Sequence, residues 1–316
     1  MSKENQPSVS VIINNYNYEN FIEQAVASVL DQDYKNIELV IVDDGSSDNS
    51  KEIISRYSGQ AEILIKENGG QASAFNAGFY KSSGDIVCFL DSDDYFFAGK
   101  VAKVVDLFGK YAEAGWVFHQ LQYTDKNGAF LPDVEERATE DLIFTDFREQ
   151  LRSVKKMPYF PATTALSFRR EILLNVFPVP EIFRISADSF LRLTSLCQSP
   201  GVLCPDNLSA HRQHGDNLFV THPDMHRKWA ENDIHVAFYL HERFPEFRAF
   251  TNRMFSRGAG RLMAIKGLKS VMEQFEVRQY VKKFKSGGHY SGWFSCAACA
   301  LLNFVREKKR IRACQE

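Results

Sequence analysis

The segment CFLDSDDYF at residues 88–96 joins an apolar run to three carboxylates, Asp91, Asp93 and Asp94. Carboxylates this close repel one another and resist leaving water, so stability alone does not favour them at the exit of a core strand. Carboxylate oxygens in an Asp-X-Asp pattern suit Mg²⁺ or Mn²⁺. The segment therefore predicts a metal site that also binds a diphosphate. The alternative is an acid that caps the following helix.

The residues around this segment repeat an order of strand and helix. Strands are predicted at 9–13, 38–42, 63–65, 85–90, 115–123 and 163–168, and helices at 19–32, 48–58, 71–82, 99–112, 170–176 and 187–197. This alternation, with nearly continuous apolar strands, predicts an α/β fold whose mostly parallel sheet has helices on both faces. From about residue 223 the periodicity is entirely helical. We therefore expect an α/β domain over residues 1–220 and a helical C-terminal region over residues 221–316.

Polar residues follow three of the predicted strands, at 14–17, 43–46 and 91–94. Ligands of parallel sheets bind beyond the carboxyl ends of the strands, so these residues are expected to share one site. A carboxylate at Asp43 or Asp44 could accept the N–H of a pyrimidine base, and Tyr16 could stack on that base. The alternatives are an ordinary tight turn and a packed tyrosine.

Four segments together resemble the family 2 glycosyltransferases: VSVIINNYN at 9–17, VIVDDGSSD at 40–48, ENGGQASAFNAG at 67–78 and GDIVCFLDSDD at 84–94. The resemblance implies a GT-A fold, which is Rossmann-like, and a nucleotide-sugar donor site. Asp44 would bind the base with Asp43 close by, Tyr16 would stack on it, and Asp91 would face the ribose or the sugar. The residues implied at the donor are Asn14, Tyr16, Asp43, Asp44, Asn68, Gly69, Gly70, Asn76, Asp91 and Ser92. Asn14 is a departure, because the family commonly has proline there.

Two later segments, ISADSFL at 185–191 and HRQHGDN at 211–217, resemble the family more loosely. The first implies that Asp188 is the catalytic base; its alternative is an acid favoured by a helix N-terminus. In the second, Arg212 or His214 would touch the diphosphate or the metal. The implied metal, Mn²⁺ or Mg²⁺, would be held by Asp93 and Asp91 with His214. The alternative for His214 is a purely structural imidazole.

The resemblance implies an inverting enzyme that transfers a sugar, preferably from a UDP-sugar, to a saccharide or lipid-linked acceptor. Such an activity would serve the biosynthesis of cell-surface polysaccharides or glycans. The alternative is a module that binds nucleotide sugars without catalysis. A nicotinamide enzyme is excluded because no Gly-X-Gly-X-X-Gly follows the first strand. An Asp-nucleophile phosphohydrolase is disfavoured because the paired acids close the fourth strand rather than an early one.

The composition limits the partners. Lys and Arg number 38 against 40 Asp and Glu, so the formal charge of −2 favours no nucleic-acid partner. Six sparse cysteines and an N-terminus without an apolar leader favour a reducing, cytoplasmic location. Residues 292–312 are apolar and then basic, which predicts either a peripheral contact with the inner face of a membrane or a helix that packs on the protein.

Overall fold

The computed structural model describes residues 6–132, 139–215, 224–286 and 300–308. The chain forms two compact units: Met1–Arg148 with Lys156–Gly215, and Glu149–Lys155 with Asp216–Glu316. The predicted domain limits of 1–220 and 221–316 remain a prediction. Within the described ranges, no helix combines the length and the hydropathy needed to cross a bilayer.

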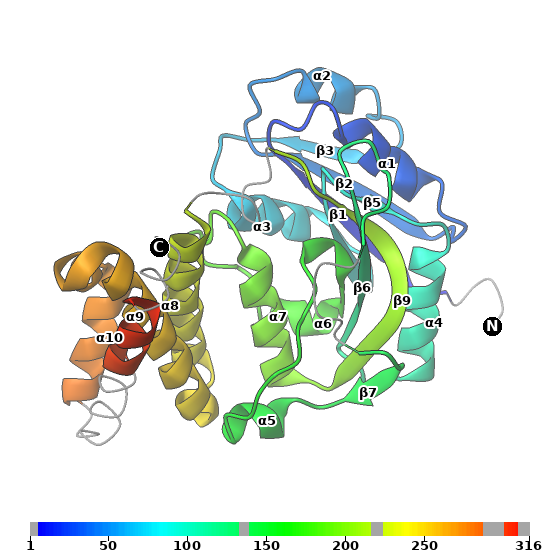
Figure 1. Cartoon of the computed structure of the whole chain (residues 1–316). Coiled ribbons are helices and arrows are strands. Elements are labelled where there is room, and N and C mark those ends of the chain that lie inside the picture. Colours follow the sequence, from blue (N-terminus) through cyan, green and yellow to red (C-terminus); the bar gives the residue numbers. More distant parts are fainter. Residues whose placement is uncertain (1–5, 133–138, 216–223, 287–299, 309–316) are drawn as a thin grey trace. The chain divides into compact units, whose positions relative to one another are not determined.

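The first unit is built on a sheet of nine described strands (Figure 1). They are β1 Val9–Asn15, β2 Ile37–Asp43, β3 Glu62–Ile65, β4 Ile86–Asp91, β5 Tyr95–Phe96, β6 Trp116–Thr124, β7 Ile143–Thr145, β8 Leu166–Arg169 and β9 Gly201–Arg212. Their order is β3-β2-β1-β4-β8-β6-β9-β5, with β7 paired to β9. Neighbours from β3 to β4 are parallel, as are β6 and β9, whereas β8 is antiparallel to both of its neighbours. The predicted α/β class with a mostly parallel sheet is confirmed.

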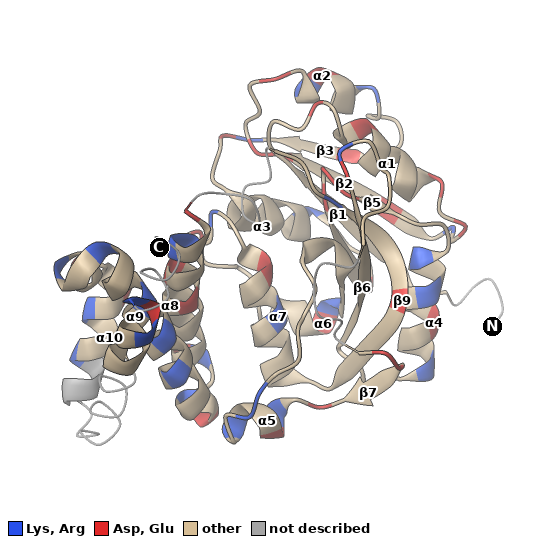
Figure 2. Ribbon diagram, viewed as in Figure 1, with Lys and Arg blue, Asp and Glu red and all other residues tan. Residues whose placement is uncertain are grey.

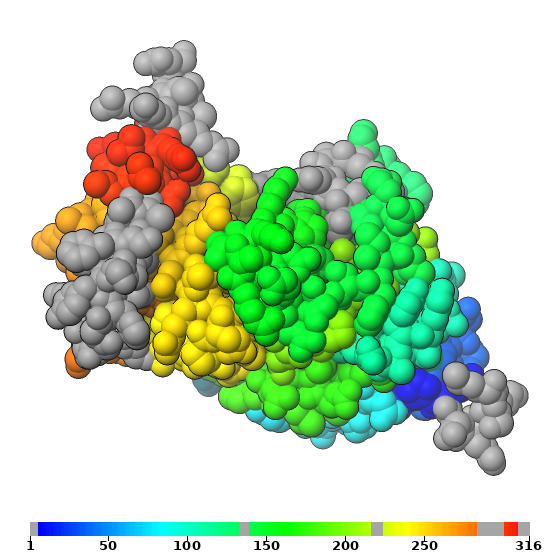
Figure 3. Space-filling view, turned by 90° about the horizontal axis from the view of Figure 1, so that it is seen from below, coloured from blue at the N-terminus to red at the C-terminus, as the bar shows by residue number. Residues whose placement is uncertain are grey.

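Helices cover both faces of this sheet, as Figure 1 shows for α4 on one face and α3, α6 and α7 on the other. The helices of the first unit are α1 Ile22–Leu30, α2 Ser50–Ser55, α3 Gln71–Lys81, α4 Lys100–Lys110, α6 Arg170–Leu174 and α7 Ala187–Gln198, with α5 Arg148–Arg152 at its boundary. A short 3-10 helix spans Thr163–Ala165. In Figure 3, side chains from the middle of the chain, in green, form much of the surface of this unit on the side seen from below.

The second unit is helical. It contains α8 Met225–Arg243, a 3-10 helix at Pro245–Phe247, α9 Arg248–Glu273 and α10 Phe275–Ser286, and residues 300–308 are also helical. Helix α9 is kinked at Gly267, whose φ of 82° and ψ of 163° lie outside the helical region.

Alternation along the strands places the core on both faces of the sheet. Val11 and Ile13 of β1 are fully buried in the cluster that includes Val26 of α1 and Val104 of α4. Ile12, between them, faces the opposite side and approaches Gly78 of α3. Successive strand side chains point to opposite faces, so this pattern requires helices on both sides.

The longest strand, β9, is the main element that the sequence pattern does not predict. Pro205, Asp206 and Asn207 interrupt its apolar residues, and proline is rare inside a central strand. The pairing with β6 is irregular here, with shifts of register on both sides of Gln120. The bulge accommodates these residues, and the strand continues to the edge where β4 ends.

Replacement of Gly78 tests the contact between α3 and β1. A Cβ at this position would lie 2.4 Å from Cγ2 of Ile12, which is buried and cannot move aside. We expect Gly78→Ala to lower the free energy of unfolding by about 1–3 kcal/mol, although alanine favours helix. Gly59→Ala, where a Cβ meets no atom within 4 Å, is the control. Denaturant titration measures both, and a Gly78→Ala protein as stable as the wild type would contradict this packing.

Candidate active site

The acid that ends β4, Asp91, is held by neutral side chains. Its Oδ1 accepts hydrogen bonds from Nδ2 of Asn14, at 2.9 Å, and from Nε2 of Gln71, at 3.2 Å. Burial and the nearby charges of Asp93 and Asp94 raise the pKa of Asp91 to about 7, against the opposing effect of the Asn14 bond. The negative charge of this cluster is therefore only partly balanced at Asp91.

Asp93 is buried and meets the imidazole of His214, whose Nε2 lies 3.1 Å from Oδ2 of Asp93. The centroid of the His214 ring is 4.8 Å from that of Phe21 and 5.6 Å from that of Tyr18. The structure thus brings together two of the three residues predicted to hold a metal, and aromatic side chains fix the position of the imidazole.

Arg212 is also buried, and its guanidinium lies over the rings of Phe21, at 4.6 Å, and Tyr95, at 5.5 Å. One of its nitrogens donates to Oε1 of Gln24 in α1, at 2.6 Å. These contacts attach the end of β9 to α1. Of the two residues predicted to reach the diphosphate or the metal, His214 meets the cluster through its side chain, at Asp93, and Arg212 meets it through its backbone N–H, at Asp94.

Asp94 has a different environment, because its partners come from the protein itself. Its carboxylate accepts hydrogen bonds from the hydroxyl of Thr164 and from the backbone N–H of Arg212, the latter at 2.9 Å, and lies 3.1 Å from Nδ1 of His211. Burial disfavours a charged imidazole, but the attraction of Asp94 outweighs it and raises the pKa of His211 to about 9. Asp94 therefore holds β9 to the end of β4 and does not cap a helix.

The turn after β2 is organised by Asp43. Its Oδ1 accepts the backbone N–H of Ser46 and its Oδ2 accepts Nδ2 of Asn15, both at 2.9 Å, and the side chain is fully buried. Tyr16 lies at the adjacent end of β1 and is 39% exposed, so its ring is accessible at this edge. The arrangement keeps Asp43 as a support of the site and leaves Tyr16 at its surface.

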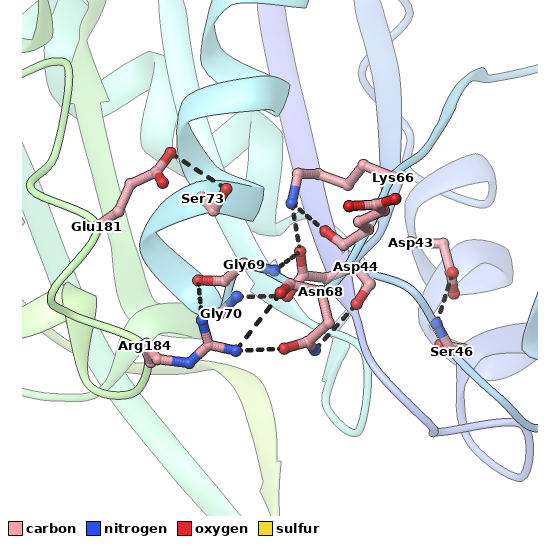
Figure 4. Close-up of polar contacts among 11 residues, drawn as sticks. Asp43, Asp44, Ser46, Lys66, Asn68, Gly69, Gly70, Ser73, Glu181 and Arg184 are labelled. Carbon is pink, nitrogen blue, oxygen red and sulfur yellow. Dashed lines mark hydrogen bonds and ion pairs between the residues drawn. The ribbon is translucent and has the colours of Figure 1, made fainter.

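Asp44 is the centre of the polar cluster in Figure 4. Its Oδ1 accepts Nζ of Lys66 at 2.7 Å and the N–H of Gly69 at 3.0 Å, while its Oδ2 accepts the N–H of Gly70 at 2.6 Å. Its carbonyl oxygen accepts Nδ2 of Asn68 at 3.0 Å. Asp44 and the segment 68–70, which were predicted to share the donor site, are thus in direct contact.

Two other predicted donor residues are engaged inside the protein. Asn76 forms paired hydrogen bonds with the backbone of Val179, donating to its oxygen at 2.9 Å and accepting its N–H at 2.8 Å. Ser92 is fully buried, and its N–H donates to the oxygen of Asn14 at 3.3 Å. Their predicted contact with a donor remains a prediction.

Asp188, the predicted base, is the second residue of α7 and is 8% exposed. Its Oδ2 lies 3.6 Å from a guanidinium nitrogen of Arg192, one turn later. The N–H of Ala187 donates to Oε1 of Gln71 at 2.9 Å, so Gln71 lies between Asp91 and the start of α7. A single glutamine carries no spacing signal, and sequence reasoning therefore missed it, as it missed Thr164 and His211.

The donor set at this edge fits a divalent cation. Asp91 and Asp93 supply hard carboxylate oxygens and His214 an imidazole, a combination that suits Mn²⁺ and Mg²⁺. A cation would also relieve the charge repulsion that raises the pKa of Asp91. Across the described residues, no three His, Cys, Asp or Glu side chains form a group that could hold a metal ion by itself. A cation here would therefore need further ligands from a bound anion.

Comparison with known proteins places the chain in a family. The model of the family described as "Glycosyl transferase family 2" matches residues 10–177. An uncharacterized glycosyltransferase of Nostoc sp. is 36% identical over 214 residues, 66% of this chain and 66% of that protein. One of Rickettsia bellii is 31% identical over 237 residues, 73% of this chain and 32% of that protein. The chain therefore spans less than two thirds of the length of these curated relatives.

Solved structures of low sequence identity share the fold. S. aureus TarS 1-349 in complex with UDP-GlcNAc matches with a TM-score of 0.65 and 16% identity, covering 97% of this chain and 92% of that chain. The mannosyltransferase PcManGT from Pyrobaculum calidifontis, in complex with GDP-Man and Mn²⁺, matches with a TM-score of 0.54 and 17% identity. It covers 96% of this chain and 87% of that chain.

The role of Asp94 can be tested by its removal. Asp94→Ala would leave His211 and the N–H of Arg212 without their buried acceptor, and we expect a loss of about 3–5 kcal/mol in the free energy of unfolding. Asp206→Ala removes a half-exposed ion pair between Asp206 of β9 and Lys103 of α4, and it should cost less than about 1 kcal/mol. Denaturant titration compares them, and equal losses would refute the anchoring role.

Proposed function

Because the chain belongs to glycosyltransferase family 2, we propose that it transfers a sugar from a UDP-sugar to an acceptor hydroxyl with inversion at the anomeric carbon. One observation carries the proposal. The side-chain amide of Gln71 is bonded both to Asp91, in the acidic cluster, and to Ala187, which precedes Asp188. Asp188, a carboxylate able to act as a base, thus lies at the start of α7, which Gln71 joins to the carboxylates that suit a metal and, through it, a diphosphate.

The preference for uridine rests on the hydrogen bonds of Asp44. An ionised carboxylate has about four acceptor positions. Among the described residues, three are used by Lys66, Gly69 and Gly70, which leaves one. One position suits the single ring N–H of uracil better than the adjacent N–H and amino groups of guanine. TarS, a neighbour in fold, has been solved with UDP-GlcNAc, and thymine shares the N–H of uracil.

In the proposed reaction Asp188 accepts the proton of the acceptor hydroxyl while the oxygen of that hydroxyl attacks the anomeric carbon. The bond from that carbon to the diphosphate breaks, and the configuration at the anomeric carbon is inverted. Asp93 and Asp91 with His214 would hold Mn²⁺ or Mg²⁺, which when bound offsets the charge developing on the leaving diphosphate. The tight packing of His214 against Phe21 and Tyr18 orients its imidazole toward Asp93.

We place the acceptor among saccharides or lipid-linked saccharides of cell-surface polysaccharide or glycan biosynthesis, in the cytoplasm. Of residues 292–312, predicted to contact a membrane, 292–299 and 309–312 lie outside the described residues. In the described part, Leu301, Leu302 and Val305 are exposed. Helix α9 in the same unit carries six Lys or Arg and one Glu, seen as blue in Figure 2, and three of the six, Arg257, Arg261 and Lys266, pair with acids of this unit. Exposed apolar residues together with basic ones support contact with an anionic lipid surface.

The proposed base is tested with Asp188→Asn, using release of UDP from UDP-GlcNAc and other UDP-hexoses in the presence of Mn²⁺. Loss of a general base should lower kcat by about 10²–10⁴-fold, and binding of UDP should be unchanged. Asp106→Asn, at an exposed position of α4, is the matched control and should retain the activity of the wild type.

Two outcomes would oppose the proposal. If wild type and Asp188→Asn are equally inert with every donor but both bind UDP, the chain is a non-catalytic module that binds nucleotide sugars. If both release UDP at the same rate, a group other than Asp188 is the base.

A further inference from the structure

Capping hydrogen bonds join the start of α3 to the start of α7 and to the segment that precedes α7. The first two backbone N–H groups of α3, those of Gln71 and Ala72, donate to the oxygens of Arg184 and Phe183, at 2.9 and 3.1 Å. The residue before α7, Ser186, has a left-handed backbone with a φ of 58° and makes no side-chain cap. The first N–H of α7 is instead accepted by Oε1 of Gln71. The first turn of α3 is thus capped by the segment that precedes α7, and the first N–H of α7 is capped by a side chain of α3.

The nitrogen of the Gln71 amide contacts the acidic cluster. Its Nε2 donates to Oδ1 of Asp91 at 3.2 Å and to Oγ1 of Thr163 at 3.3 Å. A glutamine amide has one oxygen and two N–H groups, and all three are used here. The opposite orientation of the amide would place its oxygen against a carboxylate and its nitrogen against the N–H of Ala187. The side chain is thereby fixed in one orientation between Asp91 and α7.

The backbone around this amide has little room to move. A Cβ at Gly70, whose φ is +88°, would lie 2.6 Å from Cα of Arg184. The Arg184 guanidinium donates to the oxygen of Gly69 at 3.1 Å and to the side chain of Asn68 (Figure 4). These contacts do not involve the side chain of Gln71. A variant that loses only the amide should therefore keep the two segments together and fold.

We propose that Gln71 is a positioning residue that holds the start of α7, and with it Asp188, at a fixed distance from Asp91. This inference rests on the proposed function, in which Asp188 is the base. Displacement of a reacting group by about 1 Å can lower a rate by about 10²-fold. The hydrogen bonds between Asp44 and the backbone of Gly69 and Gly70 do not include the Gln71 amide, so the nucleotide site is expected to survive its loss.

The test replaces Gln71 with methionine, which has a similar length and forms no equivalent hydrogen bonds. We expect kcat for transfer or for UDP release to fall by about 10- to 100-fold, while KM for the UDP-sugar changes by less than about threefold. The same substitution in an Asp188→Asn background should cause little further loss, since Gln71 acts through Asp188. A purely structural role would lower both backgrounds by the same factor.

Gln32 offers a matched control within the same unit. It is buried, whereas Gln71 is partly buried; its Oε1 accepts the N–H of Val101 at the start of α4, and its Nε2 donates to the oxygens of Ser28 and Phe97. Its amide thus forms three hydrogen bonds of the same kind, and the helix that it caps, α4, carries no proposed site residue. Gln32→Met should lose stability to a similar extent and keep kcat within about twofold of the wild type.

Three results would overturn the inference: a Gln71→Met enzyme with the kcat of the wild type, an equal loss of kcat in Gln32→Met, or additive losses of Gln71→Met and Asp188→Asn. Failure of the proposed function is a separate outcome. It would show as a wild-type protein without turnover or an Asp188→Asn protein as active as the wild type, and it would remove the basis of the inference as well.

Discussion

Repulsion among Asp91, Asp93 and Asp94 is the constraint on which the rest of this site depends. The protein balances it unequally. Asp94 has a charged partner in His211, and Asp93 meets His214, whereas Asp91 has neutral partners among the described residues. Because burial and the neighbouring acids raise the pKa of Asp91 to about 7, the remaining imbalance is concentrated at the end of β4. A cation bound there would remove it, and a diphosphate would supply the cation with further ligands.

The same acids bring distant segments of the chain together. Strand β9 runs beside β6 and reaches Asp94 through the N–H of Arg212, which places His214 against Asp93 two residues beyond the end of the strand. On the other side, the amide of Gln71 ties Asp91 to the first N–H of α7. The acids that end and follow β4 are thus contacted by residues of β9, of the loop after it and of α3, and the packing of these elements positions the chemistry.

The positions of the first four strands along the chain were predictable because each is a short run of β-branched and apolar residues that ends in polar ones. The family was predictable from four motifs whose order is specific, and the comparisons confirm it. Strand β9 was not predictable, because Pro205 and Asp206 break its pattern and the bulge that accommodates them depends on pairing with β6. Its length depends on tertiary contacts that local propensity does not record.

The predicted site residues differ in how far local sequence could describe them. The contact of Asp44 with Gly69 and Gly70 follows from two motifs that lie at the ends of adjacent strands. Asn76 was predicted at the donor, yet its amide is bonded to Val179, a partner about a hundred residues away. Gln71 could not be recognised either, because its importance comes from partners on two other elements. Motifs locate such residues, whereas only the fold identifies their partners.

The central claim is that the acids after β4 bind a cation together with the diphosphate of a nucleotide. Calorimetric titration of Mn²⁺ into the protein with saturating UDP tests it most directly, using wild type and Asp93→Ala. The account predicts uptake of Mn²⁺ by the wild type that depends on UDP, and affinity weakened by at least about 10-fold in Asp93→Ala. Absence of uptake by the wild type, or equal affinity in the variant, would contradict it.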